Sequence, residues 1–542
     1  MTGHELEITV LDSARIFPSR PAEKPVAIPL SIVDASTSNY GPCSAVWYFN
    51  RATTDEPENV LPPCSLRFAT ELRESLSNTL SDFPHFAGRL KYLSHDPAGD
   101  HTRRYGRIEL TYGTEEDPGV VFTTAHCNIR LDEIVPEAES RRTEEGRIWD
   151  LSGMLSHKFI PSSPVLALKT EEINAIAPAV MVQITDFLCG GLCVGVMIAH
   201  PLADAHTMGI FMHRWQYEHT QLLAAKGSIT VKAEPTAIPP LPLIDPQMVD
   251  KAAAGDIEAA EADPAICAKG RSLPTFRHDW YAAPEGKEPE LPPGLEKDMI
   301  KTPGDTMPWK DWDPTIPPIQ CKLFFTGDAV QRMWEAANSP EAPVSKHDAI
   351  LAHVWQAVSR ARGLSEDEGL VYLNIFFGMR KRLGIPDNYV GSPISTTNVG
   401  IPGKDVENAP LATIARKIKT QLNLYDREAL AARLHDAIFE CAPQRLWDAF
   451  LGTRHIIITS WARLNLYAVD FGGERGTARF VDPILPVLDG LMQVMEARPE
   501  TTSGKDSGKK KQWCDDGVDV SLFILKDVKE KLMQDEKLWA YS

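Results

Sequence analysis

The sequence predicts an α/β protein made of two large halves that are joined by a long crossover. A chain of 542 residues is too long for one compact core. Buried strands and amphipathic helices alternate in both parts of the chain, whereas residues 234–320 are rich in Pro, Glu, Asp and Ala and show little periodicity. We therefore expect an N-terminal domain at 1–233, a crossover linker at 234–320 and a C-terminal domain at 321–542.

Composition and charge exclude several classes of function. With 43% hydrophobic and 24% charged residues the chain is typical of globular proteins, and a net charge of -18 argues against a nucleic-acid partner. The nine cysteines are scattered without the spacing of a zinc site or a disulfide framework. The N-terminus has no export signal, and the longest uncharged apolar run, at 187–199, is too short to span a membrane. We expect a cytoplasmic protein with no metal and no membrane partner.

In the N-terminal half, the leucines of 69–83 lie at helical spacing, which predicts an amphipathic helix. Two buried strands follow at 179–187 and 192–199, joined through the glycines of "CGG". The next stretch has an apolar stripe at helical spacing, and Gly227 is placed to end that helix. His200 should therefore lie in the turn between the second strand and the helix.

The crossover reads as a partly flexible linker, and regular structure returns with the strand "CKLFFTG" and a helix around "DAVQRMWEAAN". Ser345 is placed to cap a further helix, with Asp348 at its third position. Three more strands are expected at "GLVYLNIFFG", "HIIITSW" and "VDVSLFIL", the last one before a closing helix. The second half therefore repeats the alternation of the first.

The stretch "VGVMIAHPLADAHTM" contains the first candidate for chemistry. His200 ends a buried strand, and a rigid strand followed by a tight turn presents an imidazole to an open site better than a helix interior does. The alternative is a core histidine that hydrogen-bonds Asp204. Likewise Trp461 is by itself a plain core aromatic, so the residues alone leave both interpretations open.

The run "QITDFLCGGLCVGVMIAHPLADA" resembles the HxxxD block of the BAHD acyl-CoA-dependent acyltransferases, a superfamily that includes fungal trichothecene acetyltransferases. Further blocks resemble the family in the family's own order: "LRESLSNTLSDFPHFAGRL", "VSKHDAILAHVWQAVSRAR", "NIFFGMRKRLGIPDNYVGSPI", "TSWARLNLYAVDFGGERG" and "ARFVDPILPVLDGLMQVM". Together they span both halves and leave mainly the crossover and a C-terminal insert uncovered.

The resemblance implies two chloramphenicol-acetyltransferase-like domains, each a mixed β-sheet flanked by helices, with a solvent tunnel between them. Acyl-CoA would enter from one side and the acceptor from the other, without an acyl-enzyme. His200 would be the general base that accepts the proton of the acceptor hydroxyl. The indole N–H of Trp461, helped by Thr459, would stabilise the oxyanion.

By the same resemblance, Asp204 would pair with Arg380 or Arg382 and hold the histidine loop in shape, without relaying protons. Other expected roles are shaping a turn (Asp470, Gly472) and contacting the coenzyme phosphates (Lys381, Arg382). Two departures weaken the carry-over about loop shape and coenzyme packing: Ala205 stands where the family usually has Gly, and Gly473 where it usually has Trp.

The expected function is that of an O-acyltransferase of specialised metabolism, a monomer that moves an acyl group from acyl-CoA to a small-molecule alcohol, with no permanently bound cofactor. The alternatives are N-acylation of an amine and a non-catalytic ligand- or protein-binding relative. A condensation domain of an assembly line is disfavoured, because that family has paired histidines where this chain has Ala199 before His200. A rival mechanism makes Cys189 a nucleophile activated by His200.

Overall fold

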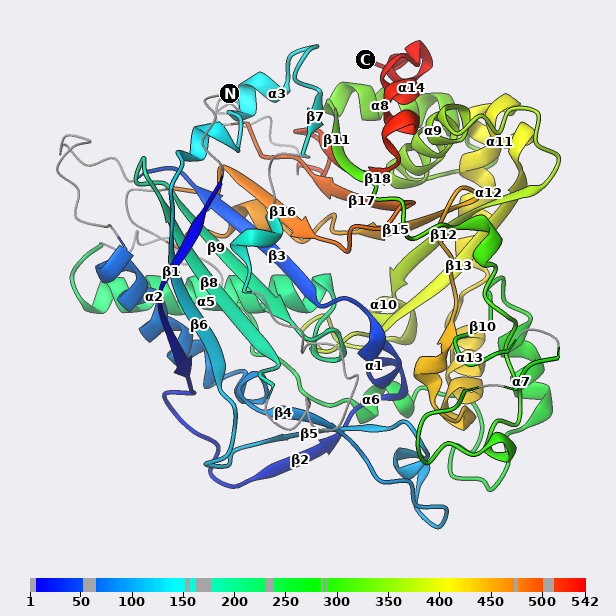
Figure 1. Cartoon of the computed structure of the whole chain (residues 1–542), viewed down its shortest axis with the longest axis horizontal. Helices are drawn as coiled ribbons and strands as arrows, with labels where there is room; N and C mark the ends of the chain where they lie inside the picture. The colour runs from blue at the N-terminus through cyan, green and yellow to red at the C-terminus, as the bar shows by residue number, and fades with distance from the viewer. Residues whose placement is uncertain are drawn as a thin grey trace.

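The computed structural model describes residues 6–51, 65–151, 156–161, 177–229, 238–283, 286–288, 290–471, 476–500 and 511–542. Two large β-sheets form the two halves (Figure 1). The first has the order β1-β6-β8-β9-β3-β16 and the second β13-β12-β15-β17-β18-β11-β7. Both combine parallel and antiparallel pairs, and both are flanked by helices. The expected α/β class with two mixed sheets is confirmed.

The strands of the first sheet are β1 (Ile8–Ile16), β3 (Cys43–Phe49), β6 (Val120–Cys127), β8 (Val180–Phe187), β9 (Leu192–Ile198) and β16 (Phe480–Ile484). Those of the second are β7 (Ile148–Asp150), β11 (Ile319–Phe325), β12 (Leu370–Gly378), β13 (Ile394–Pro402), β15 (His455–Ser460), β17 (Leu491–Glu496) and β18 (Val518–Ile524). Two small sheets contain β2 (Val26–Pro29), β4 (Arg89–Tyr92) and β5 (Ile108–Tyr112), and β10 (His278–Asp279) with β14 (Leu446–Trp447).

The longer helices are α2 (Ser65–Leu80), α5 (Ala205–Ala225), α8 (Gly327–Ala337), α9 (Lys346–Ala361), α12 (Leu411–Asn423) and α13 (Arg427–Phe439). The shorter ones are α1 (Ile32–Ser36), α3 (Ala138–Arg141), α6 (Gln247–Asp250), α7 (Pro264–Arg271), α10 (Arg380–Leu383), α11 (Gly403–Asn408) and α14 (Lys526–Met533). The expected helix at 69–83, the strands around "CGG", the Ser345 cap and the closing strand and helix are all confirmed.

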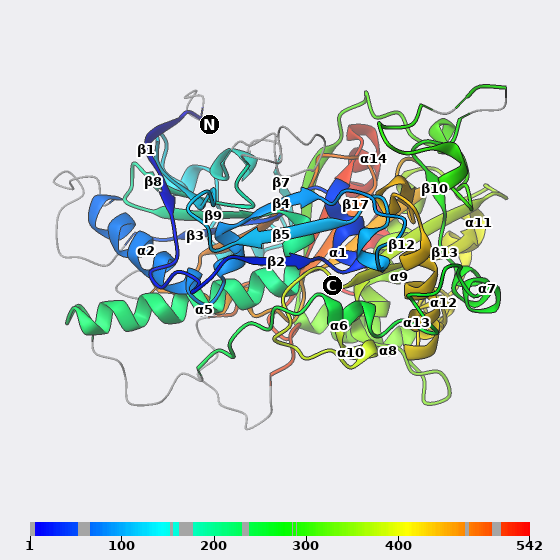
Figure 2. The same ribbon diagram turned by 90° about the horizontal axis from the view of Figure 1, so that it is seen from below.

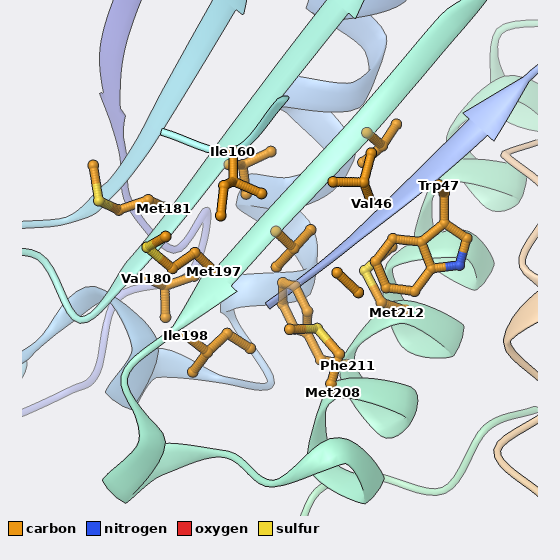
Figure 3. Packing of buried hydrophobic residues seen from close by; sticks show 14 of the residues in the cluster. Val46, Trp47, Ile160, Val180, Met181, Met197, Ile198, Met208, Phe211 and Met212 are labelled. Carbon is orange, nitrogen blue, oxygen red and sulfur yellow. The ribbon is translucent and has the colours of Figure 1, made fainter. Parts of the chain in front are cut away.

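Packing against α5 fixes the position of β9, the strand that carries His200 at its end. Helices α2 and α5 lie side by side along the first sheet (Figure 2). Met208, Phe211 and Met212 of α5 are fully buried and point toward Trp47 of β3 (Figure 3). Each such apolar side chain contributes about 1.5–3 kcal/mol when buried. The helix ends at Lys226, and Gly227 follows with φ of 69°, which glycine adopts without strain.

Two strands cross the division expected at the crossover. Strand β16, from the second half of the chain, pairs with β3 in the first sheet, and β7, from the first half, pairs with β11 in the second. The ranges 1–233 and 321–542 therefore supply most of each sheet but not all of it. Each half is completed by a strand from the other.

The crossover has more structure than the sequence predicts. Helix α7 packs against α13, and β10 pairs with β14, so this segment lies on the second half as part of its wall. The described residues 238–283 of this crossover contain the short elements α6, α7 and β10. Its prolines and acidic residues hide the pattern, because short elements show no long periodicity. No helix in the described ranges is both long enough and apolar enough to cross a membrane.

Candidate active site

His200 lies where β9 leaves the first sheet. It is the first residue of a short 3-10 helix, His200–Leu202, and α5 begins directly after it with Asp204 as the N-cap. The Asp204 carboxylate accepts a hydrogen bond of 2.9 Å from the backbone N–H of Thr207, which satisfies a donor at the helix start. The strand, turn and cap together hold the imidazole at the junction.

The ring lines a cavity of about 1120 Å³ between the two sheets. This volume exceeds the roughly 300–1,000 Å³ that is typical for one small ligand. Tyr40 and His200 come from the first half, while Phe376, Thr459 and Trp461 come from the ends of β12 and β15 or just beyond. The cavity is therefore large for one small ligand, and both halves of the chain contribute to its wall.

The hydrogen bonds of His200 define which ring nitrogen is available. Its Nδ1 lies 3.0 Å from Ser392 Oγ, so this nitrogen already has a partner. Burial lowers the pKa of His200 to about 4. At neutral pH the ring is therefore uncharged, and Nε2 is the ring nitrogen that has no hydrogen-bond partner among the described residues.

Ser392 is itself held by a buried carboxyl group. Its backbone N–H donates to Asp34 Oδ1 at 2.6 Å, and Ser31 Oγ donates to the other oxygen of Asp34, also at 2.6 Å. Burial raises the pKa of Asp34 to about 6. Neither residue is predicted from the sequence, although Ser392 directly follows the Tyr-x-Gly segment that resembles the family. The position of Ser392 beside this motif was the one signal in the sequence that it belongs to the site.

Asp204 and Arg380 form a two-pronged ion pair under the histidine turn. Arg380 donates to the two carboxylate oxygens at 2.5 and 3.0 Å, and also to Thr207 Oγ1 and to the carbonyl of Gly391. Burial alone would raise the pKa of Asp204, but Arg380 brings it below its usual value. Of the two arginines that the sequence offered, Arg380 makes the pair. Arg382 instead donates to the backbone carbonyls of Leu422, in the last turn of α12, and of Tyr425, just after this helix.

Trp461 and Thr459 both line the cavity at the end of β15. The backbone N–H of Trp461 donates to Val494 O at 2.8 Å, which fixes its position beside β17. Within the described part of the chain, neither the indole N–H nor the Thr459 hydroxyl has a hydrogen-bond partner. Both donors are therefore available to a ligand.

Three basic side chains line the cavity and together are called its cationic part: Lys381, Lys419 and Arg463. Over the described residues neither lysine forms an ion pair. The guanidinium of Arg463 lies 5.9 Å from the ring centre of Trp513. In a chain of net charge -18, these side chains are local groups that can meet an anion.

The remaining predicted residues lie elsewhere. Asp470 does not line the cavity and stands between two core residues, Val469 and Phe471. Gly472 and Gly473 are outside the described residues. Ala205 is the first residue of α5, in a helical conformation that any residue adopts, so the turn does not require the family's glycine at this position.

Cys189 is not placed to act as a nucleophile. It lies in the turn before β9, while His200 follows the far end of that strand. At about 3.3 Å per residue, the seven residues of β9 separate the two by roughly 20 Å or more. The Cys189 thiol accepts a hydrogen bond from the backbone of Leu131 instead. The rival mechanism with Cys189 is wrong.

Comparison with known proteins agrees with this geometry. The model of the Transferase family matches residues 6–258 and 274–506. The chain is 27% identical to the acyltransferase AFT15-1 of Alternaria alternata, over 98% of this chain and 97% of the relative. It is 25% identical to the acyltransferase abl6 of Leptosphaeria maculans, over 98% of both.

Among solved structures, TRI101 of F. graminearum complexed with coenzyme A and T-2 mycotoxin superposes with a TM-score of 0.62. It is 15% identical and covers 95% of this chain and 99% of its own, so this likeness shows the fold. The chain belongs to the Transferase family, that of the BAHD acyltransferases, and is an acyltransferase.

Proposed function

We propose that this protein is an acyl-CoA-dependent O-acyltransferase in which His200 acts as general base on a small-molecule alcohol. The observation that carries the proposal is the neutral imidazole, with Nδ1 occupied by Ser392, at the wall of a cavity that the two halves share. Only Nε2 is left to accept a proton from a ligand.

The reaction then proceeds in two steps within one ternary complex. The acceptor oxygen attacks the thioester carbonyl while its proton moves to Nε2, a transfer worth roughly 10²- to 10⁴-fold in rate. The tetrahedral oxyanion receives hydrogen bonds from the Trp461 indole N–H and the Thr459 hydroxyl, and such a donor is worth about 10²- to 10³-fold. When the C–S bond breaks, the thiolate takes the proton from Nε2, and His200 is neutral again.

Asp204 and Arg380 serve this reaction as positioning residues. They tie the start of α5 to the loop of Gly391, whose neighbour Ser392 contacts the imidazole. We assign Asp470 to the shape of the chain after Leu466–Ala468, because it does not line the cavity. Gly472, for which the family resemblance implies the same role, lies outside the described residues.

The cationic part of the wall is the proposed site for the phosphates of acyl-CoA. Lys381 is exposed there and has no internal partner within the described ranges, whereas Arg382 is partly engaged by backbone carbonyls. Lys419 and Arg463 complete the site. The solved TRI101 structure contains coenzyme A and a second small molecule, which supports a ternary complex in a cavity of this size.

The test is release of free coenzyme A with a panel of acyl-CoA donors and alcohol or amine acceptors. We expect acceptor-dependent release that falls at least about 10²-fold in His200→Ala, because the general base is lost. His95→Ala, an exposed histidine in a surface loop, is the matched control and should retain activity. Equal rates in His200→Ala and the wild type would reject the base, and coenzyme A binding without release for any acceptor would favour a non-catalytic relative.

A further inference from the structure

A continuous row of aromatic side chains leads from His200 to the surface. The ring centre of Tyr40 lies 5.3 Å from that of His200, Trp447 lies 5.3 Å from Tyr40, and Trp280 lies 6.4 Å from Trp447. Trp280 ends the row and is 44% exposed. All four rings line the cavity, so aromatic side chains are present along the wall from Trp280 to the base.

The outer part of this row is built by the crossover. Trp280 and Trp312 both belong to the crossover, and Trp312 packs on Phe450, which also lines the cavity. Leu485 and Leu488 complete the same part of the wall. In the described ranges, no charged side chain lines this part, which runs from the crossover to β14 and the loop after β16.

The carboxylates of the cavity lie elsewhere and are mostly occupied. Asp204 is bound by Arg380, and Asp348 accepts hydrogen bonds from the side chain and backbone of Ser345 at the start of α9. Asp387 belongs to the loop after α10, in the cationic part. Asp448 follows Trp447 and adds to the effect of burial in raising the pKa of Tyr40, but it is paired with Arg433 and is not among the residues that line the cavity. An ammonium group in the aromatic part would therefore find no unpaired carboxylate on the described wall, so charge recognition does not explain this wall.

We infer that the acceptor is an uncharged, extended apolar molecule whose hydroxyl is at its inner end, and that the aromatic row of Tyr40, Trp447 and Trp280, with Trp312 beside it on the same wall, holds its skeleton. This inference rests on the proposed acyl transfer and names the substrate class of the same site. Aromatic side chains bury large areas and bind by shape and apolar contact, which suits a long skeleton without polar groups. The crossover is then the segment that selects the acceptor.

The experiment measures kcat/KM by coenzyme A release for straight-chain primary alcohols of four to ten carbons with acetyl-CoA. Each added methylene that is buried should raise kcat/KM about three- to four-fold. Trp280→Ala and Trp447→Ala should lower kcat/KM for the ten-carbon alcohol at least ten-fold and leave the four-carbon alcohol nearly unchanged. Leu188→Ala removes an exposed apolar side chain at the β8–β9 turn and is the control.

Three further arms separate the alternatives. With the four-carbon alcohol and a series of longer acyl-CoA donors, kcat/KM should be the same in Trp280→Ala as in the wild type. A selective loss of kcat/KM with long donors would place the acyl chain at Trp280 and overturn the inference. Diamines of matched length should be poorer acceptors than the alcohols, and the reverse order would also overturn it. If no acceptor releases coenzyme A, the proposed function fails, and calorimetric binding of the ten-carbon alcohol to wild type and Trp280→Ala still decides the inference. Binding that is equal in both proteins, or absent from both, would refute it.

Discussion

The ion pair of Asp204 and Arg380 offers a sharp test of how the histidine turn is held. The change is Arg380→Met, which removes the guanidinium and keeps a long side chain. The side chains of Arg380 and Asp204 are only 6% and 8% exposed, so the variant leaves a buried carboxylate without its counter-charge. Breaking a buried pair in this way costs about 3–5 kcal/mol of folding free energy.

The matched variant is Asp204→Asn, because asparagine still caps α5 and only the charge is lost. In the double variant the buried charges are both gone, so we expect it to be more stable than the sum of the two single losses predicts. Urea unfolding of the four proteins gives the coupling free energy, for which we expect at least about 2 kcal/mol. A coupling below about 0.5 kcal/mol would refute the argument, since contacting buried charges cannot be that independent.

The same variants separate positioning from proton relay. If Asp204 only positions the turn, Asp204→Asn lowers kcat while the pH dependence of the remaining activity keeps its shape. If Asp204 relayed protons, the limb of the pH profile that reports the base would be lost. Two-state behaviour in the unfolding curves is the control that the lower kcat does not come from an unfolded fraction.

Three further predictions follow from the site and the core. Ser392→Ala should lower kcat about five-fold with little change in the KM for acyl-CoA, because one hydrogen bond of roughly 1 kcal/mol that orients the imidazole is lost. Ser392→Thr should rescue kcat, and a change confined to that KM would contradict the role. Trp461→Phe should lower kcat about 10²-fold if the indole N–H stabilises the oxyanion, and an unchanged kcat would argue for a packing role alone. The free energy of unfolding should fall as the pH drops from about 6.5 toward 4. Four buried histidines have pKa values lowered to about 3 or 4 in the folded protein, so over this range they bind protons in the unfolded chain but not in the folded one. They are His85, His200, His219 and His353. Each histidine lowers the free energy of unfolding by about 1.4 kcal/mol per pH unit. Asp34, whose pKa is raised to about 6, binds a proton in the folded protein between pH 6 and 3.8 and so offsets the loss from one histidine there. Urea midpoints that stay constant at pH 7, 6 and 5 would refute this prediction.

The local frame of the site could be predicted from the sequence because short-range rules determine it. Glycines between two apolar runs gave the β8–β9 hairpin, and the stripe after His200 gave α5. The Ser345 cap with Asp348 was equally readable, since capping depends on residues three apart. These signals placed His200 in a turn at a strand end, which is the part of the site that one segment builds.

The rest of the site depends on contacts between distant segments. Ser392 meets His200 across 192 positions of the chain, and Asp34 meets Ser392 across 358. No periodicity reports such pairs. Trp280 and Trp312 were hidden for a different reason, because the polar, proline-rich composition around them is typical of linkers. Large aromatic residues inside a segment of this composition were the signal that a binding wall had formed there.

Exchange of strands between the sheets explains why a site shared by two halves can be rigid. β7 and β16 each complete the sheet of the other half, so the halves cannot separate without breaking backbone pairing in both. Between them, Lys322 of β11 lies 2.9 Å from Asp482 of β16, and both side chains are almost fully buried. This pair joins the second sheet to the first at a single position, and its charges would be costly to uncover singly. A catalytic constellation must be held to within about 0.5 Å of its productive geometry. The proposed base, His200, follows a strand of the first sheet, and the proposed donors, Thr459 and Trp461, lie at the end of a strand of the second. The two can act on one ligand only if the sheets are fixed in this way.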